Sequence, residues 1–193
     1  MTLIRLDMTV SLDGFVAGLQ DGVDAPMGVG GFRLFNWLDR RHDPDENGQV
    51  FNEAMATRAV ISGRRTYENA GRWNGDHHDG VPIFVLTHDV PDDPPPGSVR
   101  YLTDVRECAD AARAAAGDGD VVAMGAGAAQ ALLSAGELDE LELHVVPVLL
   151  GHGRRLFENL PATRFELELV RCLTPNAENR EQQVTHLRYR VVQ

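Results

Sequence analysis

Three short segments of the chain are apolar at almost every position, and they limit the possible folds more than any other feature. They are residues 59–62, 82–87 and 121–124. A strand of this kind has both faces covered, whereas a strand with one face in water alternates apolar and polar residues. Helical patterns follow or precede these segments, which is typical of helices packed on both faces of a largely parallel sheet. The sequence therefore predicts an α/β fold.

The remaining patterns complete this alternation of strands and helices. We expect further strands at 3–11, 15–17, 99–102 and 141–150, the last with a bulge or an edge position at Pro147. We expect helices at 32–41, 48–56, 105–116 and 128–135. Residues 165–169 and 187–191 alternate cleanly and predict an antiparallel hairpin across the polar loop 174–182. The glycine-rich stretch 18–31 is predicted to be a mobile loop.

The length of 193 residues fits one domain, spanning residues 1–193. The strongest break is the proline-rich segment 90–98, which we interpret as a rigid exposed connection within that domain. The apolar runs are far shorter than the roughly 18 residues that a membrane-spanning helix needs. The start of the chain lacks the pattern of a signal peptide. We therefore expect no membrane partner and a cytoplasmic location.

The net charge of −11, with arginine as the only strongly basic residue type, argues against nucleic acid as a partner. The two cysteines, Cys108 and Cys172, are too few for a disulfide framework or a four-cysteine zinc site, and both are predicted to be buried thiols. The polar segment around His77 and His78 is predicted to be an exposed loop rather than a metal site. We expect no metal.

The first candidate site is the turn Gly63-Arg64-Arg65-Thr66, which follows a buried strand and opens a helix. Backbone N–H groups at a helix start, guanidinium groups and a hydroxyl together suit a phosphate. The alternative is an ordinary helix start with two solvated arginines.

The second candidate site is the turn formed by Gly125, Ala126, Gly127 and Ala128, which also joins a strand to a helix. Small residues allow a ligand to approach the backbone closely. The pattern is an imperfect dinucleotide fingerprint, because Gln130 stands where the third glycine would be. The alternative is a small-residue turn that is needed only for packing. Two such turns at the carboxyl ends of parallel strands nevertheless favour a ligand site there.

Five motifs in order give the chain a resemblance to a known superfamily. They are SLDGFVAG (11–18), GRRTYE (63–68), PIFVLT (82–87), GAG (125–127) and PVLLG (147–151). This order is similar to that of the dihydrofolate-reductase-like superfamily, and in particular to the reductase domain of the riboflavin-pathway enzymes, the RibD C-terminal domain. The resemblance covers nearly the whole chain. It implies a three-layer α/β/α sandwich with a mixed, mostly parallel sheet and an antiparallel C-terminal hairpin.

The resemblance also implies NADPH as cofactor and hydride transfer to a pterin or pyrimidine-type ring. It assigns Arg64, Arg65 and Thr66, with Gly63 before them, to the cofactor phosphates. The remaining implied cofactor contacts are Val16 and Ala17 at the nicotinamide, Leu86, Thr87 and His88 at the adenosine, and Gly125, Ala126, Gly127, Ala128 and Gln130 at the pyrophosphate. The expected reaction is that of a 5-amino-6-(5-phosphoribosylamino)uracil reductase.

Candidate substrate residues come from the segment 32–38. Phe35, Trp37 and Leu38 are either plain core residues or the lining of a substrate pocket. Asp13 is the candidate for a polar substrate contact or a proton relay, with the polar half of a tight turn as its alternative role. Dihydrofolate reductases carry a carboxylate on the first helix, and this segment has none in an inward position. We therefore expect poor reduction of dihydrofolate, unless Asp13, Asp21 or Asp24 supplies that carboxylate.

Alternative functions remain open from the sequence. They are a dihydrofolate-reductase-type enzyme, a general reductase of small carbonyl or nitro compounds, and a non-catalytic sensor that binds NADPH. The long apolar segment 141–150 and the terminal hairpin also predict a homodimer, because an uncovered apolar sheet face favours association.

Overall fold

The computed structural model describes residues 2–92 and 99–192. The strands are β1 (Ile4–Ser11), β2 (Phe15–Ala17), β3 (Ala59–Gly63), β4 (Ile83–Leu86), β5 (Val99–Leu102), β6 (Val121–Met124), β7 (Glu140–Val146), β8 (Arg154–Arg155), β9 (Glu166–Leu173) and β10 (Thr185–Val192). The α-helices are α1 (Glu46–Met55), α2 (Arg64–Asn69), α3 (Val105–Ala116) and α4 (Ala126–Ala135). The 3₁₀ helices are η1 (Gly31–Arg40), η2 (Gly71–Gly75) and η3 (Arg180–Gln182).

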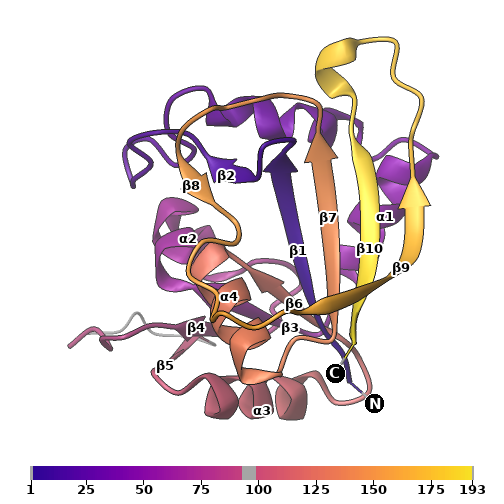
Figure 1. Ribbon diagram of the computed structural model, residues 1–193. Coiled ribbons are helices and arrows are strands. Elements are labelled where there is room, and N and C mark those ends of the chain that lie inside the picture. The colour runs from indigo at the N-terminus through magenta and orange to yellow at the C-terminus, as the bar shows by residue number, and fades with distance from the viewer. Residues whose placement is uncertain (1, 93–98, 193) are drawn as a thin grey trace.

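Eight strands form one mixed sheet in the order β5-β4-β3-β6-β1-β7-β10-β9 (Figure 1). The first six of these strands run parallel, β10 is antiparallel to β7, and β9 is antiparallel to β10. The strands β2 and β8 pair separately, beside the end of β1. The predicted mostly parallel sheet and C-terminal hairpin are confirmed.

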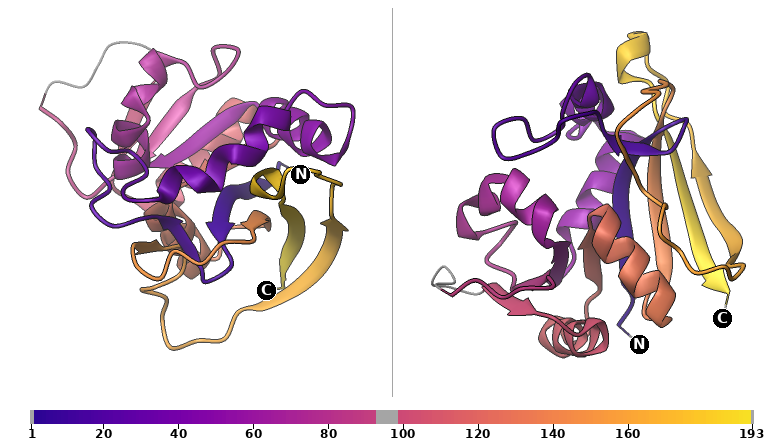
Figure 2. Two further views of the ribbon diagram at one scale, coloured as in Figure 1. Left: turned by 90° about the horizontal axis from the view of Figure 1, so that it is seen from above. Right: turned by 60° about the vertical axis from the view of Figure 1, so that its left-hand side comes forward.

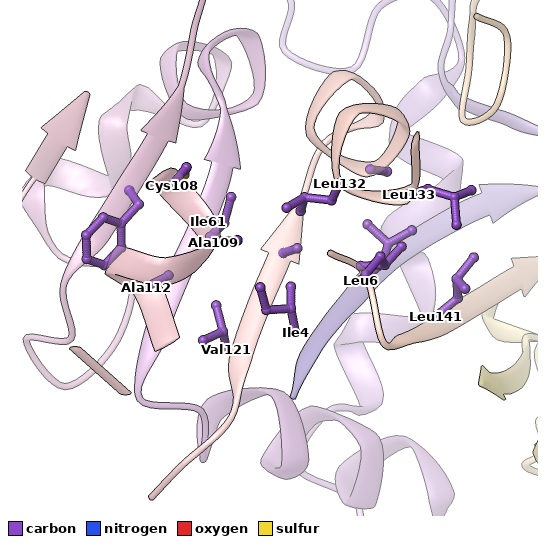
Figure 3. Packing of buried hydrophobic residues seen from close by; sticks show 14 of the residues in the cluster. Ile4, Leu6, Ile61, Cys108, Ala109, Ala112, Val121, Leu132, Leu133 and Leu141 are labelled. Atoms are coloured by element: carbon purple, nitrogen blue, oxygen red, sulfur yellow. The ribbon is translucent and has the colours of Figure 1, made fainter. Parts of the chain in front are cut away.

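The helices cover both faces of the sheet (Figure 2). On one face, α3 and α4 pack their small and aliphatic residues against the centre of the sheet. Figure 3 shows Ile4, Leu6, Val121 and Leu132 pointing into this cluster. On the other face, α2 covers Val60 and Val122, while η1 and α1 cover the half of the sheet that contains β7. The predicted three layers are therefore present.

Local signals explain where the helices begin and end. The Asp104 side chain accepts hydrogen bonds from the backbone N–H groups of Arg106 and Glu107, which caps α3. Gly136, with φ of 72°, ends α4. Both α1 and α4 begin two residues earlier than the sequence predicts.

The structure corrects several expectations. The predicted strand 141–150 ends at Val146, because Pro147 has no N–H group to continue the ladder. The predicted helix 32–41 is instead the 3₁₀ helix Gly31–Arg40, with buried residues at every third position, namely Gly31, Leu34 and Trp37. Trp37 is therefore a core residue of this helix, and Phe35 is 39% exposed.

The side chains of Leu167 and Leu169 on β9 are exposed, which agrees with the expected uncovered apolar face of the hairpin. One further expectation, for the cysteines, was wrong. Cys108 is buried as expected, and burial raises the pKa of its thiol to about 12, but Cys172 is exposed. Most of the predicted proline-rich connection, residues 93–98, lies outside the described residues. None of the described helices is both long and apolar enough to cross a membrane.

One face of the sheet carries polar residues in register beneath η1 and α1. Asp7 on β1 stands beside Glu142 on β7, and Glu142 stands beside Arg188 on β10. In the next register row, Thr9, His144 and His186 occupy the same three strands. Glu142 and both histidines are almost completely buried. This polar face forms the inner wall of the candidate site.

Candidate active site

Two adjoining cavities open along the side of the sheet that η1, α1 and α2 cover. The first has a volume of about 420 Å³ and is mostly apolar. The second has a volume of about 910 Å³ and lies over the starts of α2 and α4. Five residues line both cavities: Arg65, Thr66, Asn69, Ala126 and Arg154. The two cavities therefore form one continuous cleft with an apolar end and a polar end.

The two predicted glycine turns meet inside this cleft. An added Cβ at Gly125, where φ is +95°, would lie 2.4 Å from the Thr66 hydroxyl and 3.5 Å from the Gly63 nitrogen. An added Cβ at Gly63 would lie 3.5 Å from the Ala128 nitrogen. The turn at Gly125 can come this close to Thr66 only because it lacks a side chain, whereas a Cβ at Gly63 would make an ordinary van der Waals contact. Gly125 therefore supports the second cavity from behind, while Gly127 and Ala128 line it.

Arginine side chains surround the junction of the cavities. The Arg64 Nε donates to Glu68 over 2.9 Å, and this ion pair raises the pKa of Arg64. Arg154 binds the Asp21 carboxylate through two hydrogen bonds of 3.1 Å, and Arg65 reaches the same carboxylate at 3.4 Å. Burial raises the pKa of Asp21, but the two arginines outweigh it and lower that pKa overall. These cations are therefore held in place before any ligand binds.

The apolar cavity contains the predicted substrate residues. Phe35, Trp37 and Leu38 line it from η1, and Val16 and Ala17 line it from β2. The Trp37 indole Nε1 donates to the Thr9 hydroxyl over 3.2 Å, which fixes the ring against the sheet. A flat ligand would therefore meet an aromatic wall on one side and the β2 backbone on the other.

A line of hydrogen-bonded side chains runs from this cavity into the core. The Asp7 carboxylate, which lines the cavity, is 3.2 Å from His144 Nε2. The Nδ1 atoms of His144 and His186 are 2.7 Å apart, and His186 Nε2 is 3.2 Å from the Asn47 side-chain oxygen. Burial, with the nearby charge of His144, lowers the pKa of His186 to about 3. We call Asp7, His144 and His186 the relay.

The segment around His77 and His78 is the largely exposed loop that the sequence predicts, but the two histidines themselves are half-buried. His77 lines the apolar cavity, and its Nδ1 lies 2.6 Å from Nδ1 of His78. His78 Nε2 in turn faces the Thr57 carbonyl oxygen at 2.9 Å. Burial and the neighbouring His78 lower the pKa of His77 to about 4. Within residues 2–92 and 99–192, no group of three or more His, Cys, Asp or Glu side chains is placed to hold a metal ion.

Most of the predicted cofactor residues line the cleft. Those that line one cavity or both are Val16, Ala17, Gly63, Arg64, Arg65, Thr66, Leu86, Thr87, His88, Ala126, Gly127 and Ala128. Gln130 lies outside both linings, where its side chain binds the backbone of Leu156 and Asn159. The role predicted for Gln130 at the pyrophosphate therefore has no geometric support.

Asp13 also lies outside the lining of both cavities. Its carboxylate accepts hydrogen bonds from the Ser11 hydroxyl at 2.6 Å and from the backbone N–H groups of Leu150 and Gly151. The Ser11 hydrogen bond is the main reason that the pKa of Asp13 falls to about 2. The structure thus gives Asp13 its alternative role, as the polar part of a turn.

Asp7 and His144 are the site residues that the sequence reasoning missed. The segment 32–38 indeed places no carboxylate in the cavity, but Asp7 on β1 and Asp21 in the glycine-rich loop do. Asp21 is one of the residues that the sequence analysis named as an alternative source of a carboxylate, whereas Asp7 was not foreseen. The available signal was the charged residue in the middle of an apolar strand, since Asp7 lies between Leu6 and Met8. A partly buried charge of this kind requires partners and often marks a functional site.

Comparison with known proteins agrees with this fold. Residues 109–178 match the family described as the RibD C-terminal domain. A search of the curated proteins found no match. A protein from Shewanella sp. PV-4, described as a candidate riboflavin biosynthesis protein, is 21% identical with a TM-score of 0.70 and full coverage of both chains.

A second solved structure is similar over almost the whole chain. It is the dihydrofolate reductase of Enterococcus faecalis in complex with NADP(H) and RAB-propyl. The identity is 15%, the TM-score is 0.65, and the alignment covers 99% of this chain and 97% of the other. The family match covers residues 109–178, and the two solved structures show that the chain shares their fold over almost its whole length.

Proposed function

We propose that the protein is an NADPH-dependent reductase of the 5-amino-6-(5-phosphoribosylamino)uracil reductase type. The observation that carries this proposal is the continuous cleft. Its polar end combines arginines with the start of a helix, and its apolar end combines aromatic residues with the carboxylates of Asp7 and Asp21. A dinucleotide with a phosphate-rich half and a flat redox ring needs this combination of surroundings.

The residues of the polar end fit such a cofactor. Gly127 and Ala128 bring the first turn of the ten-residue helix α4 to the cavity surface, where its backbone N–H groups can bind phosphate. Arg64, Arg65 and Arg154 add positive charge, and Thr66 adds a hydroxyl. The bound cofactor would supply a hydride. The protein would hold it in line with the apolar cavity, exclude water and orient the acceptor.

The preference for NADPH over NADH rests on Arg64 and Arg65. Both side chains are partly exposed, and each has a carboxylate neighbour that a 2′-phosphate can replace. Glu68, Asp89 and Asp104 line the same cavity and would repel that phosphate. We expect the arginines to dominate, because charge-assisted hydrogen bonds to phosphate are strong. NADP(H) in the Enterococcus faecalis enzyme supports the same preference.

Asp7 favours a second candidate function on the same fold. A carboxylate at the floor of an aromatic cavity can pair with the N–H groups of a dihydropterin ring. A dihydrofolate-reductase-type activity is therefore retained as the alternative. General reduction of small carbonyl or nitro compounds and sensing of NADPH without catalysis also remain open. For the whole protein, we propose a homodimer in the cytoplasm.

Two measurements test the proposal. Fluorescence titration is expected to give a dissociation constant for NADPH at least about tenfold below that for NADH, which corresponds to roughly 1.4 kcal/mol. Arg65→Gln should narrow this difference, whereas Arg106→Gln, on the outer side of α3, should not. Steady NADPH oxidation with the phosphoribosylaminouracil substrate separates an enzyme from a sensor. Equal constants for the two cofactors would contradict the cofactor assignment.

A further inference from the structure

The order of donors and acceptors along the hydrogen bonds of the relay is fixed by one side chain, that of Asn47. The Asn47 amide nitrogen donates to the Asp45 carboxylate at 3.2 Å, and Asp45 is also held by Arg40 at 2.6 Å. A carboxylate can only accept hydrogen bonds, so Asn47 must turn its oxygen towards His186. That oxygen can also only accept. His186 Nε2 must therefore carry a proton.

The remaining contacts then fix the number of protons in the relay. One proton must lie between the two Nδ1 atoms, which are 2.7 Å apart. Another must lie between His144 Nε2 and the Asp7 oxygen, which are 3.2 Å apart. This last proton belongs either to His144, which leaves a carboxylate and a positive imidazole pair, or to Asp7, which leaves both imidazoles neutral. In both arrangements the relay holds one proton more than a carboxylate and two neutral imidazoles would hold.

The surroundings permit one such extra proton. His144 is 2% exposed and His186 is fully buried, so a second positive charge on the pair is strongly disfavoured. Trp37 covers the pair, with its ring centre 4.6 Å from that of His144 and 5.1 Å from that of His186. The charged and titratable groups that face the relay or its direct neighbours are Glu142 on β7, Arg188 on β10, Arg171 on β9, Glu53 on α1, Asp45 before α1, Arg40 on η1 and His77 after η2.

We propose that the relay stores the proton which the reduction consumes, and that Asp7 is the group which presents it to the substrate. This proposal rests on the proposed reductase function. Asp7 would be a catalytic residue because it lines the cavity, and His186 would be a positioning residue that acts through His144. The substrate would be a compound with a C=N or C=O bond whose heteroatom can reach the Asp7 carboxyl group.

The step balances in atoms and charge. A dihydronicotinamide donor gives a hydride to the carbon of the C=N or C=O bond and becomes a pyridinium ion. The π electrons of that bond move to the nitrogen or oxygen, which takes the proton as the Asp7 O–H bond breaks. A closed cavity without water favours the neutral arrangement beforehand, in which this proton sits on Asp7.

The relay is then left with a carboxylate and two neutral imidazoles. In this state one acceptor must face another acceptor, either at Asp7 and His144 or at His186 and Asn47. Such a contact between acceptors is unfavourable in a buried site. The relay therefore takes a proton from water once the cavity opens, which completes the cycle.

The first arm of the test needs no substrate. NMR of ¹⁵N-labelled histidine in the free protein near neutral pH should show three protonated ring nitrogens in the His144–His186 pair, since water in the open cavity favours the Asp7 carboxylate. The Asp7→Asn variant should show two. Asp110→Asn, an exposed carboxylate on α3, is the matched control and should show three. Two protonated ring nitrogens in the wild-type protein would overturn the proposal.

The second arm measures reduction of 5-amino-6-(5-phosphoribosylamino)uracil, and of dihydrofolate in parallel, beside NADPH binding. We expect Asp7→Asn to lower the rate of reduction at least about a hundredfold, the usual range for a lost general acid, while the NADPH dissociation constant changes less than about twofold. His186→Gln should move the alkaline limb of the kcat profile to lower pH with little change in KM. His152→Gln, at an exposed position, should leave the profile unchanged.

The outcomes separate the relay from the proposed function. If the wild-type protein reduces either compound and Asp7→Asn does so at the same rate, the relay is wrong and the reductase function stands. If His186→Gln left the pH profile of kcat unchanged, the role of the His144–His186 pair would likewise be overturned. If the wild-type protein binds no NADPH and reduces neither compound, the proposed function fails, and the catalytic use of the relay fails with it.

Discussion

Single residues decide how closely the two glycine turns of the cleft approach each other. Gly125 has φ of +95°, a conformation that residues with a side chain rarely adopt, and it also faces the Thr66 hydroxyl directly. Gly127, two residues later, lies within α4 with no atom within 4 Å of an added Cβ. The same substitution at these two positions should therefore have opposite effects.

We expect Gly125→Ala to lower the free energy of unfolding by about 2 kcal/mol or more, because backbone strain and the contact with Thr66 add together. It should also weaken NADPH binding, since the turn would move. Gly127→Ala should instead raise the free energy of unfolding by roughly 0.4–1 kcal/mol. Denaturant unfolding of both variants measures these two changes. If Gly125→Ala and Gly127→Ala had the same free energy of unfolding, the turn at Gly125 would not be constrained.

We expect Asp13 to contribute to the stability of the folded state and not to catalysis. Its folded-state pKa of about 2 lies below the ordinary value of 3.8, so its carboxylate stabilises the fold above about pH 4. This contribution is lost as the pH falls from 3.8 towards 2. Asp13→Asn should lower the melting temperature at neutral pH, and this loss should shrink in acid. If Asp13→Asn had the same melting temperature as Asp110→Asn at every pH, the role of Asp13 in stability would be contradicted.

At the level of elements, the sequence patterns predicted the order of strands and helices well. Continuous apolar runs indicate buried strands, and clean alternation indicates a strand whatever its burial, which is why 59–62, 121–124 and the terminal hairpin were found. The end of β7 at Val146 and the 3₁₀ form of η1 depend on tertiary contacts that local patterns do not contain. The relay was missed because Asp7 and His144 are separated by 136 intervening residues and meet only through the pairing of β1 with β7.

The exposed apolar surface of β9 leads to a prediction about assembly. Leu167, Leu169 and Val170 are 42%, 55% and 45% exposed on the edge strand of the sheet. Edge strands with such residues favour association. We expect a homodimer at micromolar concentration that buries part of β9, and a monomer in Leu169→Glu. Leu149→Glu, at an exposed apolar position outside the hairpin, is the control. A monomeric wild-type mass by light scattering would contradict this prediction.

Across the whole molecule, the polar face of the sheet makes stability depend on pH. His77 and His186 have folded-state pKa values of about 4 and about 3, both below the ordinary histidine value of 6.5. The unfolded chain therefore takes up protons first as the pH falls below 6.5, and the folded state loses stability. Between its folded-state pKa and pH 6.5, each histidine contributes a slope of about 1.4 kcal/mol per pH unit to the free energy of unfolding.

We expect the free energy of unfolding to fall between pH 6.5 and pH 5, above the range in which the carboxylates protonate. His77→Gln should reduce the slope in this interval, whereas His152→Gln should leave it unchanged. Urea unfolding at several pH values measures both slopes. A free energy of unfolding that is constant over this interval would show that neither histidine is held neutral by burial.

Hydride transfer to a bound acceptor distinguishes a reductase from every other use of this cleft. The measurement is mass spectrometry of the product formed from 5-amino-6-(5-phosphoribosylamino)uracil with NADPH that carries deuterium at C4 of the nicotinamide, using each C4 stereoisomer in turn. One stereoisomer should give a product that contains one deuterium, with one NADPH consumed per product. A product without deuterium from both stereoisomers, or NADPH that binds without being consumed, would contradict the proposed reductase.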